Sequence, residues 1–400
     1  MFKHLLSCMS LGTPSVAAAA TDFEPQRTYA VIAGVLEWPA DKAIGGFAKE
    51  NRKDRELYDT LERIGVPKEH MTLLLDEQAT FEGMCKALST VLEHTTPDST
   101  FVFYYAGHGG RDSFLNYDYV VNEKEKCCFY HAEITEAVKK HFKGRNVLLL
   151  ADCCHSGGLG VVANNLAAAG FKAASLTSAD ITVGSTGNWT FTQSILDALN
   201  GSVLFDSDND GFITLGETAA EVASEMAFRE SQPFGYTLAG IPDSWRLCRT
   251  SGAPLSQGPA PGSFQLKEYV KAPDEKDTRV GRIVGWETGR YLVEFYGYSE
   301  KKRVVCEPAQ LGAITLKTYE PGKMVTVSWR KEPVAAKVVK QQNGFHLVSY
   351  IGWPSDKWVP ATIIATDSGN KRYYIHYVGD EAVWDEWVTD NRMKRIDPAE

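Results

Sequence analysis

The sequence predicts an α/β domain with a mostly parallel sheet flanked by helices, followed by small all-β SH3-like barrels. From residue 28 to about residue 240, short β-branched runs alternate with amphipathic helical patterns, which is typical of parallel strands joined by crossover helices. Beyond about residue 249 the helical patterns largely disappear, and the apolar runs become short and aromatic. We therefore expect two regions of different fold class within the 400 residues.

The elements of the α/β region follow from hydrophobic periodicity. The first strand is expected over 29–35 and the first helix over 50–64, where Leu57, Leu61 and Ile64 share one face. The second helix is expected over 80–92 with Thr80 as its N-cap. The remaining expected elements are strands over 71–75, 100–103, 147–150 and 173–177 and helices over 132–142, 190–199 and 215–228.

The C-terminal third is repetitive. Residues 250–262 are rich in Ser, Gly, Pro and Ala, which indicates a flexible linker. Three similar strands then recur, each preceded by another strand, and such repeats predict small barrels. The similar strands cover 291–297, 346–352 and 374–379. The predicted domains are a leader at 1–26, the α/β domain at 27–248, a linker at 249–278, a first barrel at 279–316 and one or more barrels at 317–400.

Composition limits the partners and the compartment. The net charge of −9 argues against a nucleic-acid partner, and the apolar residues are too scattered for a membrane span. The eight cysteines include two adjacent pairs and no disulfide framework, which favours a reducing, cytoplasmic compartment. Small residues over 16–21 would suit a signal-peptidase site, but Gly12 and Pro14 interrupt the apolar stretch before it. We expect a disordered leader, with export as the alternative.

Two short motifs follow predicted strands and read as one active site. They are Tyr104-Tyr105-Ala106-Gly107-His108-Gly109 and Ala151-Asp152-Cys153-Cys154-His155-Ser156-Gly157-Gly158. In an open parallel sheet, ligands bind beyond the carboxyl ends of the strands, so His108 and Cys154 should share one cleft. A thiol needs such a base because its ordinary pKa is near 8.5. Cys153 would point to the opposite face of its strand, where a buried cysteine acts as a small core residue.

These motifs resemble those of the caspase-like cysteine peptidases, and within them the metacaspases and bacterial caspase-family proteins. The matching segments are 105–109 and 152–157, and 188–196 looks like that family's late helix; the likeness covers about residues 27–245. The resemblance implies that His108 and Cys154 form a catalytic dyad and that the backbone N–H groups of Gly109 and Cys154 form the oxyanion hole. Fixed donors of this kind suit a tetrahedral oxyanion.

The same resemblance implies a specificity for basic residues. Metacaspases carry an acid two positions before the nucleophile, which corresponds to Asp152, and a carboxylate there would select Arg or Lys at P1. A second acid of that family lies in the first helix, where Asp54 is the nearest match. Asp54 is equally well explained as a solvated helix residue.

An acidic loop at 206–217 satisfies the spacing of a calcium-binding EF-hand loop. We expect Ca²⁺ as a cofactor and no organic cofactor. The alternative is an acidic turn followed by a helix cap. The predicted ligands are Asp206, Asp208, Asp210, Phe212 through its carbonyl, Thr214 and Glu217.

The C-terminal barrels resemble Tudor-knot and chromo-barrel domains over about 320–396, and more weakly over 279–315. Such barrels hold methylated lysine or arginine in an aromatic cage. The candidates are Trp358, Tyr377, Trp384 and Trp387. For each of them, a place in the core of a small barrel is the preferred alternative.

The sequence thus predicts a calcium-responsive cysteine endopeptidase that cleaves protein or peptide substrates after Arg or Lys. The barrels would bind a protein partner and, through the flexible linker, recruit the substrate without taking part in catalysis. The rival interpretation is a catalytically idle caspase-like scaffold that binds partners through its barrels.

Overall fold

The computed structural model describes residues 22–39, 44–50, 52–119, 128–230, 232–251, 256, 259–275, 277–295, 302–314, 319–329, 332–342, 345–350, 359–367, 372–376 and 386–389. Most of the predicted leader therefore lies outside the described residues. Within them, no helix combines the length and the apolarity that a membrane crossing requires.

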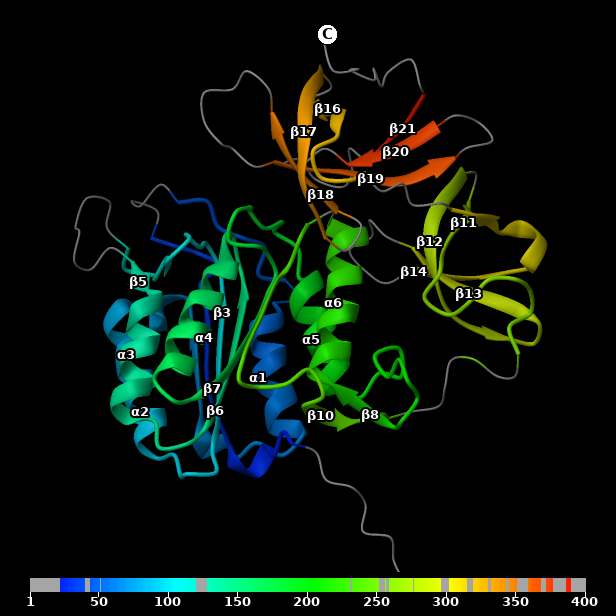
Figure 1. The fold of residues 1–400 in the computed structure, drawn as a ribbon. Coiled ribbons are helices and arrows are strands. Elements are labelled where there is room, and N and C mark those ends of the chain that lie inside the picture. The colour runs from blue at the N-terminus through cyan, green and yellow to red at the C-terminus, as the bar shows by residue number, and fades with distance from the viewer. Residues whose placement is uncertain are drawn as a thin grey trace, which may run out of the picture.

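A six-stranded sheet with helices on both faces forms the N-terminal domain (Figure 1). Its order is β2-β1-β3-β6-β7-β9, and every neighbouring pair is parallel except β7 with β9. This confirms the predicted fold class; the antiparallel edge strand β9 was not expected. The strands are β1 Thr28–Gly34, β2 Met71–Leu75, β3 Thr100–Ala106, β6 Asn146–Asp152, β7 Lys172–Thr177 and β9 Gly235–Ala239.

Within the described residues, six α-helices flank this sheet. Thr80 caps α2 as predicted, because its Oγ accepts a hydrogen bond from the Gly83 N–H at 3.0 Å. The helix that follows the Cys154 motif, α4, was not expected. The helices are α1 Lys53–Arg63, α2 Phe81–Glu93, α3 His131–His141, α4 Leu159–Ala168, α5 Thr190–Leu199 and α6 Leu215–Glu230. Short 3-10 turns are η1 Pro25–Arg27, η3 Lys68–His70, η4 Asp76–Gln78, η5 Ser156–Gly158 and η6 Pro308–Gln310.

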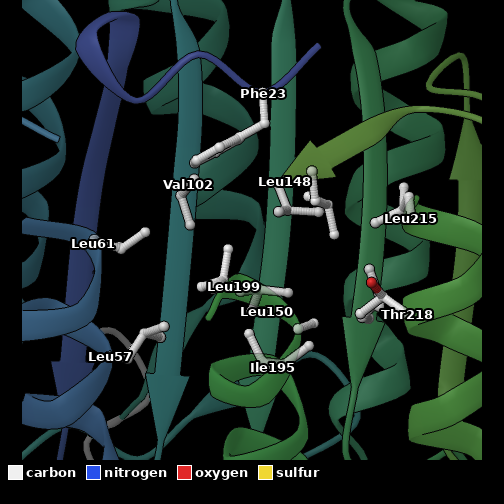
Figure 2. Close-up of a pocket in the computed structure, with 13 residues that line it drawn as sticks. Phe23, Leu57, Leu61, Val102, Leu148, Leu150, Ile195, Leu199, Leu215 and Thr218 are labelled. Carbon is white, nitrogen blue, oxygen red and sulfur yellow. The ribbon is translucent and has the colours of Figure 1, made fainter. Parts of the chain in front are cut away.

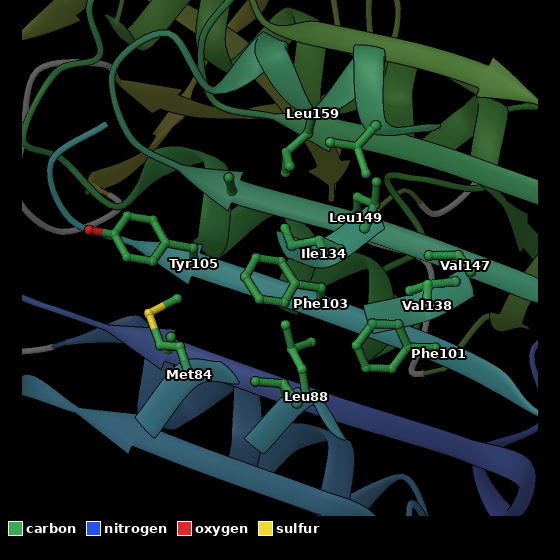
Figure 3. Packing of buried hydrophobic residues seen from close by; sticks show 14 of the residues in the cluster. Met84, Leu88, Phe101, Phe103, Tyr105, Ile134, Val138, Val147, Leu149 and Leu159 are labelled. Atoms are coloured by element: carbon green, nitrogen blue, oxygen red, sulfur yellow. The ribbon is translucent and has the colours of Figure 1, made fainter. Parts of the chain in front are cut away.

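Both faces of the sheet are buried, as expected for a parallel sheet. Helices α2, α3 and α4 cover one face, where Phe103 lies among apolar side chains from all three helices (Figure 3). Helices α1, α5 and α6 cover the other face. There a cavity of about 20 Å³ lies between Leu57, Leu150 and Ile195 (Figure 2). Its lining is almost wholly apolar, so this cavity belongs to the core.

Two β-modules follow. The first β-module (269–313) is an antiparallel sheet of order β14-β13-β12-β11-β15 with a core of its own around Tyr291 and Phe295. Its strands are β11 Tyr269–Asp274, β12 Asp277–Glu287, β13 Arg290–Phe295, β14 Lys302–Cys306 and β15 Gly312–Ala313. Strand β11 lies inside the range predicted as linker, so this module begins about ten residues earlier than expected.

The second β-module (324–389) is one continuous antiparallel sheet, with its strands in sequence order from β16 to β21. The two closely spaced repeats predicted here therefore belong to a single sheet, in which β18 pairs with β19. Its strands are β16 Met324–Trp329, β17 Glu332–Gln342, β18 Phe345–Tyr350, β19 Val359–Asp367, β20 Arg372–His376 and β21 Glu386–Thr389.

The register of the parallel strands brings three carboxyl ends into one row. Gly34 at the end of β1 pairs with Ala106 at the end of β3, and Ala106 pairs with Asp152 at the end of β6. The loops that carry His108 and Cys154 therefore leave the sheet at the same edge, side by side. In the described part of the N-terminal domain, four short strands lie outside the main sheet: β4 Ser113–Phe114 pairs with β5 Phe129–Tyr130, and β8 Phe212–Thr214 pairs with β10 Arg246–Arg249.

Candidate active site

His108 lies two residues beyond the end of β3, after Gly107, whose φ of 146° is a conformation that favours glycine. Its ring packs against the rings of Trp38 and Phe47, with centroids 5.0 and 4.7 Å away. The His108 Nε2 lies 2.8 Å from the carbonyl oxygen of Gly45. Because a carbonyl oxygen only accepts, Nε2 must carry the proton in this contact. In the neutral ring, Nδ1 is then the free base.

Cys154 lies two residues beyond the end of β6 and is half-buried. Its Sγ accepts a hydrogen bond from the Ser185 N–H at 3.2 Å and lies 3.8 Å from the Ser185 carbonyl oxygen. The Ser185 backbone therefore contacts the Cys154 sulfur through both its N–H and its carbonyl group. Ser185 belongs to the loop between β7 and α5, and sequence reasoning did not single it out.

The two motifs are in contact through Gly109. A Cβ at this position would lie 2.5 Å from both the Cys154 carbonyl oxygen and the Cys153 Sγ. Only glycine allows this approach, which brings the residue after His108 against the backbone of the nucleophile candidate. Within the described chain, no hydrogen bond joins the His108 ring to Cys154.

Gly109 and Cys154 also offer two backbone donors. Neither N–H appears among the hydrogen bonds formed between described residues. The turn that follows Cys154 is tight, with His155 in the left-handed region at φ 55° and the Gly157 N–H bonded to the Ala179 carbonyl oxygen at 2.8 Å. Unused N–H groups beside a nucleophile are what an oxyanion hole requires.

Cys153 is buried, whereas the adjacent Cys154 is half-buried. The Cys153 side chain is buried in the core on the α2–α4 face of the sheet. Burial raises the pKa of the Cys153 thiol well above its ordinary value, and the negative charge of Cys154 and Asp152 adds to this. A thiol held protonated in this way is a poor nucleophile.

Asp152, the predicted P1-selecting acid, is buried at the end of β6. Its Oδ2 accepts hydrogen bonds from the Thr192 Oγ at 2.6 Å and from the Thr192 N–H at 3.3 Å. Burial raises the pKa of Asp152 to about 6, even though these hydrogen bonds oppose the shift. Across the described residues, no cation lies within ion-pair distance of this carboxylate.

Asp54 has a different environment. Its carboxylate is fully buried above Gly34, where an added Cβ would lie 1.7 Å from Oδ2. The Arg52 guanidinium donates two hydrogen bonds to this carboxylate. The Arg52 Nε lies 2.8 Å from the Asp54 Oδ1, and the Arg52 Nη2 lies 2.7 Å from the Asp54 Oδ2. The interpretation of Asp54 as a solvated helix residue is therefore wrong. Asp54 already holds a cation that the chain itself supplies.

Arg52 also binds Asp76, which sequence reasoning did not single out. Its Nη1 lies 2.8 Å from the Asp76 Oδ2, and the Leu36 N–H bonds the Asp76 Oδ1 at 2.8 Å. Burial opposes ionisation of Asp76, but these donors and the charge of Lys49 lower its pKa overall. Asp76 follows Leu75, which pairs with Gly34, so sheet register brings it to the site.

The acidic loop at 206–217 has the backbone of a tight turn, with Asn209 at φ 60° and Gly211 at φ 84°. Carboxylate oxygens of Asp206, Asp208 and Asp210 lie within 4.8 Å of one another. Together these three side chains fit the oxygen-donor set that Ca²⁺ prefers.

Glu217, predicted to close the calcium shell, bonds within the loop. Its Oε2 accepts from the Thr214 N–H at 3.0 Å, and the Thr214 Oγ accepts from the Glu217 N–H at 3.2 Å. This reciprocal pair is a capping box at the start of α6. The hydrogen bonds from Thr214 and Ser207 lower the Glu217 pKa despite its partial burial, so the carboxylate is ionised and able to bind a cation.

The predicted aromatic cage falls mostly beyond the described part of the chain. Trp358, Tyr377 and Trp384 lie outside the described residues, and Trp387 lies on β21.

Comparisons with known proteins agree with both resemblances. Residues 48–243 match the family model described as "Caspase domain". Residues 320–395 match the Tudor-knot model, described as "RNA binding activity-knot of a chromodomain". Metacaspase-4 from Arabidopsis thaliana is 28% identical over 144 residues, which are 32% of this chain and 34% of that protein. The match thus spans about a third of that relative's length.

A crystal structure of a Geobacter sulfurreducens protein is also similar, with a TM-score of 0.38 and 13% identity, covering 56% of this chain and all of the other. That likeness is too slight to bear on function.

The contrast between the two adjacent cysteines predicts selective alkylation. Iodoacetamide at pH 7.5 should modify Cys154 at least about tenfold faster than Cys153, because Cys153 is buried with a raised pKa. Peptide mass mapping over a time course measures both rates. Equal rates in protein shown to be folded by circular dichroism would contradict the assignment.

Proposed function

We propose that the chain is a cysteine endopeptidase that cleaves after Arg or Lys, on the basis of the match of residues 48–243 to the caspase-domain model. Cys154 is the nucleophile and His108 the base, and the protein responds to calcium. The observation that carries the proposal is the contact between Gly109 and the Cys154 backbone. It sets the two strand-end motifs against each other, and neither the Gly109 N–H nor the Cys154 N–H bonds another described residue.

The chemistry follows from these groups. The Cys154 sulfur attacks the scissile carbonyl carbon, and the oxyanion that forms accepts hydrogen bonds from the N–H groups of Gly109 and Cys154. His108 takes the thiol proton at Nδ1, the nitrogen left free by the Gly45 contact, and then gives it to the leaving amine. Water releases the acyl group by the reverse sequence.

Selectivity for a basic P1 residue is assigned to Asp152 in preference to Asp54. The Asp54 carboxylate is occupied by Arg52, whereas the Asp152 carboxylate is buried and bonded only to neutral donors. A P1 cation would supply the missing countercharge and so favour the ionised form of Asp152. A neutral P1 side chain would leave that charge uncompensated.

Calcium would be held by Asp206, Asp208 and Asp210, with Phe212, Thr214 and Glu217 completing the shell. When bound, the ion would neutralise the cluster of carboxylates and order the start of α6. The support is the convergence of the three aspartates together with the loop spacing.

The second β-module is proposed to recruit a protein substrate. The description of the Tudor-knot model names RNA binding. Residues 320–395 contain eleven Lys and Arg against nine Asp and Glu, so the acidity of the whole chain does not extend to this module. Binding assays with RNA and with a protein substrate, using the full chain, separate the two partners.

The proposed nucleophile is tested by paired substitutions. Cys154→Ala should abolish cleavage of a fluorogenic peptide with Arg at P1, because no other group can form the acyl-enzyme. Cys153→Ala should keep kcat/KM within about tenfold of wild type and lower the melting temperature, because Cys153 only packs in the core. Equal loss of turnover in two folded variants would refute the assignment. A wild-type protein that cleaves no peptide of a P1 panel would favour the idle scaffold.

The role of Asp152 predicts a pH-dependent preference for charge at P1. The ratio of kcat/KM for Arg over its uncharged isostere citrulline should fall as the pH drops through about 6, because protonated Asp152 no longer attracts the cation. Taking the ratio removes any pH effect on the catalytic step, because that step is the same for both substrates. Asp152→Asn should lower the ratio about tenfold or more and make it independent of pH. A wild-type preference for Asp at P1 would exclude this pocket.

The calcium site is tested by titration calorimetry. Glu217→Gln should weaken binding more than Thr214→Ala, because a bidentate carboxylate contributes two ligand atoms and Thr214 at most one. Glu217→Gln keeps an oxygen acceptor for the Thr214 N–H and so retains the capping box, whereas Thr214→Ala removes half of it. A weaker binding in Glu217→Gln therefore reports on the calcium ligand and not on the start of α6. No heat of binding at millimolar calcium with wild-type protein would leave the loop as a helix cap.

A further inference from the structure

In the middle of helix α6 lie two buried carboxylates that have no role in the proposed peptidase chemistry. Glu221 and Glu225 lie one turn apart and are 4% and 8% exposed. Both bind Arg282, which comes from β12 of the first β-module. The Arg282 Nη1 lies 2.5 Å from the Glu221 Oε1 and 2.9 Å from the Glu225 Oε1. The Arg282 Nη2 lies 3.0 Å from the Glu221 Oε2. We call Glu221, Glu225 and Arg282 the docking cluster.

The docking cluster fixes the first β-module to the caspase domain. Arg282 is itself only 4% exposed, and Lys267, just before β11, adds a second cation 3.1 Å from the Glu221 Oε2. Buried charges are tolerated only when they are paired, and losing one partner is strongly unfavourable. The module therefore cannot act as a freely tethered domain, which is what the linker composition predicted. Figure 1 shows it beside α6.

The C-terminal end of α6 contacts the loop between β7 and α5, whose Ser185 N–H bonds the Cys154 sulfur. Glu230, the last residue of α6, accepts hydrogen bonds from the Asn188 Nδ2 at 2.9 Å and from the Thr190 Oγ. Gln232, two residues beyond the helix, returns to it through a bond from its N–H to the Met226 carbonyl oxygen at 3.1 Å. Glu230 and Gln232 are both 4% exposed, so these contacts are shielded from water.

Gln232 makes the contacts that bear on the sulfur. Its Oε1 accepts from the Thr186 N–H at 2.8 Å, and its Nε2 donates to the Ser185 Oγ at 3.1 Å and to the Ser178 carbonyl oxygen. These contacts hold Ser185 through its own side chain and through the next residue, Thr186. The Ser185 N–H is the donor to the Cys154 Sγ. Gln232 thus holds in place the residue whose N–H donates to the Cys154 sulfur.

We propose that docking of the first β-module through Arg282 positions this loop, by way of α6 and Gln232, and so keeps the Ser185 N–H on the Cys154 sulfur. Arg282 and Gln232 are positioning residues, and the first β-module is part of the catalytic fold. The proposal rests on Cys154 as the nucleophile of the proposed function, but its consequence for the thiol holds whether or not the chain cleaves peptides.

The test measures the iodoacetamide alkylation rate of Cys154 at pH 7 in the full chain, by mass mapping, with the half-buried Cys248 as internal reference. Gln232→Met removes the loop contacts directly and should slow Cys154 about three- to tenfold, because the sulfur loses the N–H donor that the loop presents. Arg282→Met should slow it to a similar extent. The matched control is Arg303→Met, whose ion pair with Glu294 at 2.9 Å lies wholly within the first β-module; it should leave the rate unchanged.

Slowing is diagnostic because unfolding would speed the alkylation of every buried thiol. A wild-type rate in Gln232→Met overturns the positioning of the loop. Slowing in Gln232→Met but not in Arg282→Met overturns the link to the first β-module. If Arg282→Met does not fold, Arg282→Lys is measured in its place. Lysine keeps the charge but cannot bridge two carboxylates, so alkylation of Cys154 should be partly slowed. A wild-type alkylation rate in folded Arg282→Lys overturns the proposal.

Discussion

The alignment of parallel strand ends is the constraint on which the candidate site depends. Because β1, β3 and β6 pair in one register, Gly34, Ala106 and Asp152 form a row, and the loops beyond them share one edge. The contact of Gly109 with the Cys154 backbone follows from this row. Asp76 lies at the same edge of the sheet, because it follows Leu75 of β2, which pairs with Gly34 of β1. A shift of one residue in the pairing of β3 with β6 would separate the two motifs.

Charge balance divides the acids at this edge into two groups. Asp54 and Asp76 share the Arg52 guanidinium, so their charges are satisfied within the fold and stabilise the ends of β1 and β2. Asp152 is buried without a cation among the described residues, which is why its pKa rises to about 6. Burying a carboxylate without a countercharge costs stability, and in the function proposed above the P1 cation supplies that countercharge.

The sequence predicted the parts of the site that depend on local pattern. Strand-end placement of His108 and Cys154, the core position of Cys153 and the Thr80 cap all follow from periodicity and motif, and the structure bears out each of these positions. Arg52 with Asp76 and Arg282 with Glu221 could not be predicted, because each pair joins segments that meet only in the folded chain. For the same reason, linker composition suggested a tether where the fold shows a docked module.

Covalent labelling with a peptide that carries Arg at P1 and an acyloxymethyl ketone tests the central claim most directly. The account predicts one thioether adduct, mapped by mass spectrometry to Cys154 and lost in Cys154→Ala, and little reaction with the matching Asp peptide. It would be contradicted by an adduct on Cys153, by preferential labelling with the Asp peptide, or by no labelling of folded protein in the presence of calcium.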